Sequence, residues 1–296
     1  MADQAIIPGI NPPQFKSFGR ALAGIILLFL LPLLRLAGFA LHDDLHSYIL
    51  LMPFVCFYLA HLEKPNLVAG PSRPGNAAWI FFVAGLLMTA WYWCRPTHIP
   101  ADDLSRITLA FVLFVTGLGF YFLGNGLMRG LVYPFGLLIF MVPMPDAFRS
   151  WIETALQHGS AACAGWMFTV SDVPTVQDGL TFKLPNITMQ VAPECSGIHS
   201  SVVLLITSLV AGKFFLPKAW QRTVLCLAVI PLAMLRNGFR IFVLGELCTH
   251  FGPQMIDSQV HRHGGPLFFM LSLVPFLLLL YVLRKCGQPA RKSSDN

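Results

Sequence analysis

The sequence predicts an all-α polytopic membrane protein with about eight transmembrane helices. Hydrophobic residues make up 55% of the chain and charged residues only 11%, whereas soluble domains carry about a quarter charged residues. Apolar runs of about 20 residues, the length that spans a bilayer, recur along the whole chain. The net charge of +6 does not indicate a nucleic-acid partner, because the basic residues lie mostly in short loops between apolar runs. The partner that the composition predicts is the lipid bilayer.

The predicted spans form one continuous membrane domain over residues 20–285, between an N-terminal segment, 1–19, and a C-terminal tail, 286–296. The first apolar run can also be read as a signal peptide that ends at Ala40. Its length and the interrupting Arg35 favour an uncleaved first helix instead. The spans are predicted at 20–40, 47–62, 77–94, 107–124, 128–145, 198–216, 220–248 and 266–284.

The distribution of basic residues predicts that both termini are cytoplasmic. With the N-terminus inside, 12 Lys and Arg residues lie in inner segments and 5 in outer segments, and the cytoplasmic side is the one richer in Lys and Arg. The inner residues are Lys16, Arg20, Lys64, Arg73, Arg129, Lys213, Lys218, Arg222, Arg284, Lys285, Arg291 and Lys292, and the outer ones are Arg95, Arg106, Arg149, Lys183 and Arg262.

The longest outer segment, 146–197, is expected to carry a small β-hairpin. Its first part, 151–170, is moderately apolar and either lies along the interface or dips partway into the membrane. Asp178-Gly179 between β-prone residues predicts a hairpin turn. A second extended piece, 187–191, leads directly to Cys195, so the hairpin is expected to deliver this residue to the mouth of the sixth span.

Cys195 is the candidate nucleophile, because it lies at a water-facing break just before a helix. The unpaired N–H groups and the positive end of the helix dipole favour the thiolate, which is the nucleophilic form of cysteine. The alternative is a packing role, which suits the other six cysteines. The seven cysteines contain no CxxC pair, which fits neither a disulfide framework nor a zinc ribbon.

The seventh span contains Arg236-Asn237-Gly238-Phe239-Arg240. Counting from Arg222 near the inner surface, Arg240 lies about 27 Å along the helix, level with Cys195 near the outer surface. Snorkelling explains one arginine near a helix end, but two on one face fit better with a bundle interior or a water-filled cavity. Arg240 is therefore a candidate for stabilising an oxyanion or holding a carboxylate, with Arg236 and Asn237 in support.

Three outer histidines are candidate proton carriers. His261 and His263 lie in the last outer loop, and His199 follows Cys195 by one helical turn. A rival interpretation is a metal site made by His250, Asp257, His261 and His263. Since no HExxH or other standard metal spacing is present, neither a metal nor a cofactor is expected.

The order of these motifs resembles the exosortase/archaeosortase family. The resemblance runs from about residue 44 to 285 and rests on Cys195-Ser196-Gly197, on 237–241, and on His261 followed by Gly265 and Phe269. Asp44-Leu45-His46-Ser47-Tyr48, Met141-Val142-Pro143-Met144-Pro145 and Ala155-Leu156-Gln157 also resemble family motifs. Each motif is weak by itself; their order and spacing are specific. Two positions depart from the family pattern: the family often has arginine where His199 stands, and Glu194 is less usual before the cysteine.

The resemblance implies a bacterial inner-membrane cysteine protease and transpeptidase with its active site on the periplasmic side. Cys195 would be the nucleophile, Arg240 the arginine and His261 the histidine. Its clients would be membrane-anchored proteins with a C-terminal sorting signal, made of a short motif such as Pro-Glu-Pro, an apolar helix and a basic tail. The rival is a non-enzymatic transporter or assembly subunit for exported polysaccharide, in which Cys195 packs and the arginines form a polar pathway. The sequence leaves the acceptor, the clients, the oligomeric state and the choice of histidine open.

Overall fold

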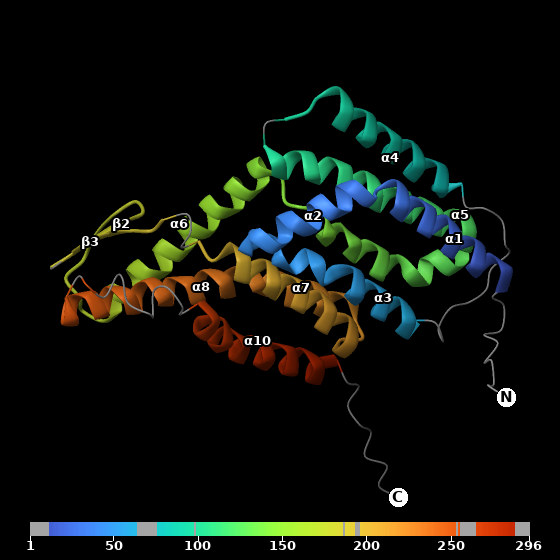
Figure 1. The fold of residues 1–296 in the computed structure, drawn as a ribbon. Coiled ribbons are helices and arrows are strands. Elements are labelled where there is room, and N and C mark those ends of the chain that lie inside the picture. The colour runs from blue at the N-terminus through green and yellow to red at the C-terminus, as the bar shows by residue number, and fades with distance from the viewer. Residues whose placement is uncertain are drawn as a thin grey trace, which may run out of the picture. The chain divides into compact units, whose positions relative to one another are not determined.

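A computed structural model describes residues 12–63, 76–97, 99–185, 187–192, 196–252, 254 and 265–287. The described chain is mostly helical, as predicted, and it divides into two compact units, Met1–Phe148 and Arg149–Asn296. Figure 1 shows the helices and the small sheet. The first unit holds α1 (Pro12–Leu28), α2 (Leu30–His42), η1 (Asp44–Leu50), α3 (Met52–Glu63), α4 (Ala77–Cys94), α5 (Pro100–Leu137) and η3 (Leu138–Met141).

The first predicted span, 20–40, is broken in the structure. The helix pair α1 and α2 is bent by 70° at Phe29. The physical cause is Pro32, whose ring clashes with the carbonyl of the residue four positions earlier and which has no N–H to bond to it. That carbonyl belongs to Leu28, the residue at which α1 ends.

The helix α5 turns back on itself at Gly124. Gly124 has φ 73° and ψ 168°, a conformation that glycine adopts easily and other residues avoid. A Cβ atom on Gly119 would lie 3.0 Å from the ring of Phe135, although these residues would be about 24 Å apart in an unbroken helix. Figure 1 shows the two arms of α5 running back along each other. The arms overlap the predicted spans 107–124 and 128–145, but the helix begins at Pro100 and ends at Leu137, before the predicted end of the second span.

Three side chains form hydrogen bonds with the backbone of residues 143–146, which follow α5 and η3. His46 donates from Nδ1 to Asp43 Oδ2 (3.1 Å) and accepts at Nε2 from the Met144 N–H (3.2 Å). Asp102 accepts from the Asp146 N–H (2.8 Å), and Ser105 donates to the Pro143 carbonyl. Two stretches that resemble family motifs, 44–48 and 141–145, therefore meet inside the first unit.

The second unit contains the predicted hairpin, extended to three strands. The order is β1-β2-β3, with antiparallel pairing throughout. Gly179, at φ +59°, makes the first turn, as Asp178-Gly179 predicted, and the extended piece before Cys195 forms the third strand. The elements of this unit are α6 (Asp146–Val170), which begins just before the unit boundary, β1 (Val176–Asp178), β2 (Thr181–Leu184), β3 (Ile187–Gln190), α7 (Ile198–Phe215), α8 (Ala219–Phe251) and α10 (Gly265–Gly287).

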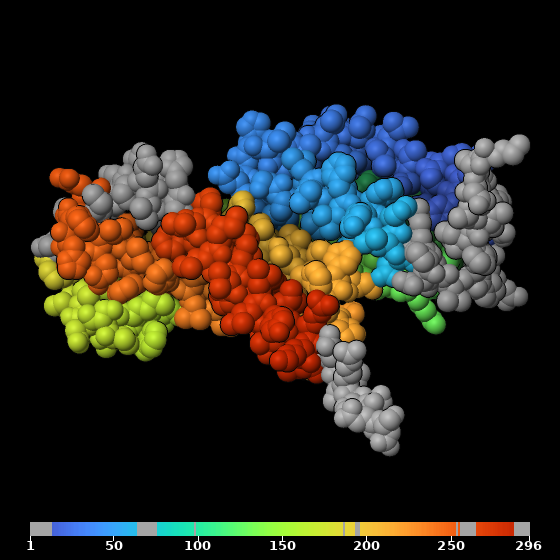
Figure 2. Space-filling model, turned by 90° about the horizontal axis from the view of Figure 1, so that it is seen from below, coloured from blue at the N-terminus to red at the C-terminus, as the bar shows by residue number. Residues whose placement is uncertain are grey.

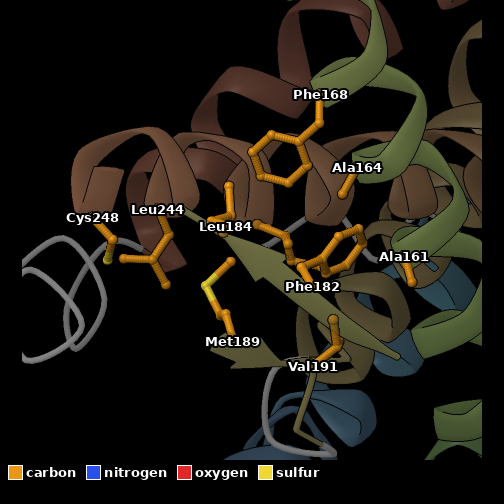
Figure 3. Close-up of a cluster of buried hydrophobic side chains, with 10 residues drawn as sticks. Ala161, Ala164, Phe168, Phe182, Leu184, Met189, Val191, Leu244 and Cys248 are labelled. Carbon is orange, nitrogen blue, oxygen red and sulfur yellow. The ribbon is translucent and has the colours of Figure 1, made fainter. Parts of the chain in front are cut away.

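One face of the sheet is buried against α6 and the C-terminal part of α8. Figure 3 shows Phe182 and Met189 of the sheet facing Phe168 of α6 and Leu244 of α8. The helices α6 and α8 approach closely at Gly238, where a Cβ atom would lie 2.6 Å from Cys163 Cβ. Figure 2 shows α10 in red against α8 in orange.

Within the described residues, six helical segments are long and apolar enough to cross a membrane, or seven if α1 and α2 form one bent span. The chain is therefore a multi-pass membrane protein. The two-armed α5 counts as one segment in this tally, so the number eight stays a prediction. The helix α6 is not among the candidates. The six segments are Asp44–Glu63, Ala77–Cys94, Pro100–Met141, Ile198–Phe215, Ala219–Phe251 and Gly265–Cys286.

The helix α8 is too long to fit inside the hydrocarbon layer. Its 33 residues extend about 50 Å, against a layer of about 30 Å, and tilts rarely exceed about 40°. Open sheet edges do not occur in hydrocarbon, because their N–H and C=O groups would lack partners. We therefore expect the sheet, and the part of α8 on which it packs, from Ile241 to Cys248, to lie outside this layer.

Candidate active site

Cys195 lies, with Pro193 and Glu194, outside the described residues, but the chain on both sides of it is described. On the N-terminal side, the Val191 N–H donates to the Leu180 carbonyl (2.9 Å). The Val191 carbonyl accepts from Nε2 of Gln157, a buried residue of α6 (3.2 Å). Two elements therefore hold the chain four residues before the cysteine.

On the C-terminal side, Gly197 begins α7 in the left-handed conformation, with φ 70° and ψ 20°. Its carbonyl accepts from Arg236 Nη2 (3.1 Å) and from Ser201 Oγ (2.8 Å). A Cβ atom here would lie 2.7 Å from Arg236 Nη2 and 3.3 Å from Asn237 Oδ1. Glycine is therefore required both by its backbone conformation and by the close approach of α8.

The helix start predicted for this region is confirmed, because α7 begins at Ile198, three residues after Cys195. The first N–H groups of a helix have no partner within the helix and carry the positive end of its dipole. Gly197 has no side chain with which to cap them. An anion that forms next to this helix start is therefore stabilised, which is the setting that a thiolate needs.

Two buried polar atoms close to Gly197 have no hydrogen-bond partner among the described residues. They are Ser196 Oγ, in a residue 1% exposed, and Arg236 Nη1, in a residue 7% exposed. An unsatisfied buried polar atom costs about 1–3 kcal/mol. Native proteins keep few of them, and each needs an explanation such as a catalytic role or an unseen ligand.

The polar residues of the seventh span differ in how deeply they are buried in α8. Arg236 and Asn237 are buried and lie against Gly197, so snorkelling to the interface does not describe Arg236. Arg240 is half-buried one turn further along. The sequence predicted Arg240 to be level with Cys195 and Arg236 to be secondary, and it did not reveal the bond from Arg236 to the Gly197 carbonyl. The bond depends on how closely α7 and α8 pack, which the sequence does not give.

The histidines are less completely described. His199 is half-buried in the first turn of α7, whereas His261 and His263 lie outside the described residues. His250 lies 3.2 Å from Glu246 on the same helix. The described residues contain no group of three metal-ligating side chains. Three of the four residues of the rival metal site, Asp257, His261 and His263, fall outside that part of the chain.

The six described cysteines are free thiols and differ in burial. Cys56 and Cys248 are buried, Cys163 and Cys226 are half-buried, and Cys94 and Cys286 are exposed. Burial raises the pKa of the Cys163 thiol, which disfavours its thiolate. Cys163 fills the contact between α6 and Gly238, so its setting suits packing.

Comparison with known proteins gives one match. A protein-family model described as transmembrane exosortase matches residues 40–278, which is most of the chain. No curated protein and no solved structure matches. The matched region begins before η1 and ends within α10, so it contains both stretches that flank Cys195 and the whole of α8.

Proposed function

The chain belongs to the transmembrane exosortase family, and on that basis we propose that it is a cysteine protease and transpeptidase that cuts C-terminal sorting signals. Its substrates are membrane-anchored proteins that end in a short motif, an apolar helix and a basic tail. The enzyme cuts at the motif, outside the anchor helix, and transfers the client to an acceptor or to water.

The reaction begins when the Cys195 thiolate attacks the carbonyl carbon at the motif. The carbonyl oxygen becomes an oxyanion, which the Arg240 guanidinium stabilises. The C–N bond then breaks, and His261 donates a proton to the departing amine of the anchor segment. The resulting thioester is attacked by an acceptor nucleophile or by water, which releases the client and restores the thiolate.

The observation that carries this proposal is the fixed frame around Cys195. Gln157 and Leu180 hold Val191 on one side, and Arg236 holds Gly197 on the other. A cysteine that only packs needs no such frame, whereas a nucleophile must be held within a fraction of an ångström of its target. The start of α7 and the arginines of α8 supply the positive potential that the thiolate and the oxyanion need.

We place the site on the periplasmic side of a bacterial inner membrane, with both termini in the cytoplasm. The excess of basic residues in the alternate loops, 12 against 5, supports this orientation. A hydrated position for the sheet supports cleavage outside the hydrocarbon layer.

The proposal predicts a covalent client adduct. Membranes that contain the full chain and a tagged client should accumulate a species with the mass of the enzyme plus the shortened client, together with the free shortened client and the released anchor segment. Neutral hydroxylamine should release the adduct, because it cleaves thioesters and leaves amides intact. The control is a client that lacks the motif but keeps the helix and the tail.

If polysaccharide export depends on this chain while no client is shortened, the chain is a transporter or assembly subunit instead. A genome that encodes no protein with the three-part signal would point the same way.

Arg240→Lys should lose most of the processing activity although it keeps the positive charge. The guanidinium is a planar fork with several donors, and an ammonium on a flexible stem does not reproduce it. Losing one oxyanion donor typically lowers kcat by about a hundredfold to a thousandfold. The rate of client shortening at saturating client measures this loss. A lysine variant as fast as the wild type would reduce the role of Arg240 to local potential.

A further inference from the structure

Arg236 carries a positive charge into the interior of the second unit. Its side chain is 7% exposed, and a buried charge is costly unless it is paired and hydrogen-bonded. Among the described residues, it forms no ion pair with a carboxylate. Its partners there are the Gly197 carbonyl at 3.1 Å and, at 3.5 Å, Ser201 Oγ. The charge is therefore only partly compensated, and Nη1 is left without an acceptor in that part of the chain.

The position of Arg236 limits its distance from Cys195. A Cβ atom on Gly197 would lie 2.7 Å from Arg236 Nη2, so the guanidinium lies within about 4 Å of the Gly197 Cα. Two residues span at most about 7 Å of chain. Along the covalent chain, Cys195 therefore lies two residues from a residue that the guanidinium touches. At an effective dielectric constant of about 20, a charge at about 10 Å shifts a pKa by about one unit.

We infer that Arg236 is a positioning residue for the nucleophile: it fixes the Gly197 carbonyl at the start of α7, and its buried charge favours the thiolate of Cys195. This role is separate from that of Arg240, which acts on the substrate oxyanion. It rests on the proposed function only in taking Cys195 as the nucleophile.

Other titratable groups lie on the elements that meet at Gly197. Arg236 differs from them in that its guanidinium bonds the Gly197 carbonyl. On α7 the group is His199, on α8 they are Arg240, Glu246 and His250, on α6 they are Glu153, His158 and Cys163, and beside Cys195 in the sequence it is Glu194. Arg236 is the charged side chain that touches the residue two positions from the thiol, so its removal should have the largest effect on the titration.

The test is the pH dependence of Cys195 alkylation by iodoacetamide, in membranes that contain the full chain. Mass spectrometry of the Cys195 peptide measures the rate separately from the other cysteines. In Arg236→Gln the apparent pKa of the thiol should rise by about one unit, so at a pH below the pKa of both proteins the rate should fall about tenfold. At a pH far above the pKa, the rate should equal that of the wild type. Arg236→Lys keeps the charge and should keep the titration curve close to the wild-type curve.

The matched control is Arg222→Gln. Arg222 lies on the same helix and also holds backbone carbonyls, those of Leu216 (2.8 Å) and Pro217 (3.4 Å), but at the other end of α7. Its loss should leave the Cys195 titration unchanged, although it too removes one arginine from α8.

An unchanged titration curve in Arg236→Gln would overturn the inference. A rate that falls by the same factor at every pH would also overturn it, because it would indicate lost access or altered structure. These outcomes are independent of the proposed function, since alkylation needs no client. Client processing that survives Cys195→Ala would defeat the proposed function whatever the titration shows.

Discussion

Cys195→Ala is expected to abolish client processing while leaving a folded, membrane-inserted chain. Without the sulfur atom no thioester forms, and neither Arg240 nor His261 can replace the attacking group. Cys195→Ser should be nearly as inactive, because a hydroxyl at a helix start stays protonated under conditions in which a thiol ionises. The measurement is the fraction of tagged client that is shortened over time in membranes with equal amounts of each variant.

The matched controls for this result are Cys56→Ala and Cys163→Ala. Both residues are described as free thiols, Cys56 buried in α3 and Cys163 packed on α6 against Gly238. These variants should process the client at close to the wild-type rate. Processing at the wild-type rate in Cys195→Ala would remove this residue from the mechanism. Equal loss in Cys163→Ala would indicate that packing, and not chemistry, limits the reaction.

His261→Ala is expected to be the most damaging of the three histidine substitutions. Losing a general acid–base group lowers the rate by about a hundredfold or more. His263 lies two residues away in the same loop, and His199 lies one helical turn after Cys195, so each can be compared in the same assay. Single alanine variants, with the rate of client shortening as readout, rank the three directly.

Two results would change the assignment of the proton carrier. Full processing in His261→Ala, with loss in His263→Ala or His199→Ala, would move the role to that histidine and leave the cysteine mechanism intact. Equal loss at His261 and His263 that is restored by added zinc would instead support the metal interpretation of this loop.

A local element could be predicted where a single residue determines the backbone conformation. Asp178-Gly179 predicted the first turn of the sheet, and Gly179 makes it with a positive φ. The bend at Phe29 was missed, although Pro32 lies three positions later, because a proline inside an apolar run does not change the hydropathy of that run. Hydropathy measures the length of such a run and not its straightness.

The candidate site was predictable as a set of residues but not as a geometry. Helical spacing puts Arg236 and Arg240 on one face of α8, but it cannot show which one reaches α7. That depends on how closely two helices pack, and here the closeness follows from Gly197, which would clash with Arg236 if it carried a side chain. Likewise, nothing in the sequence marks Gln157 as the partner of the Val191 carbonyl.

Under the proposed function, the length of α8 beyond the hydrocarbon layer affects how a client is presented to the enzyme. Enzymes that cut within the hydrocarbon must first unwind a stretch of the substrate helix, because a helical peptide bond is shielded by its own hydrogen bonds. We expect the part of α8 on which the small sheet packs to lie beyond that layer, where the segment of a client ahead of its anchor helix can be extended and hydrated. Recognition at this level requires no melting of the anchor. The client's helix can stay intact in the bilayer and serve as a tether that delivers the motif at a fixed height, so that moving the motif along the client chain by a few residues should matter more than changing the helix sequence.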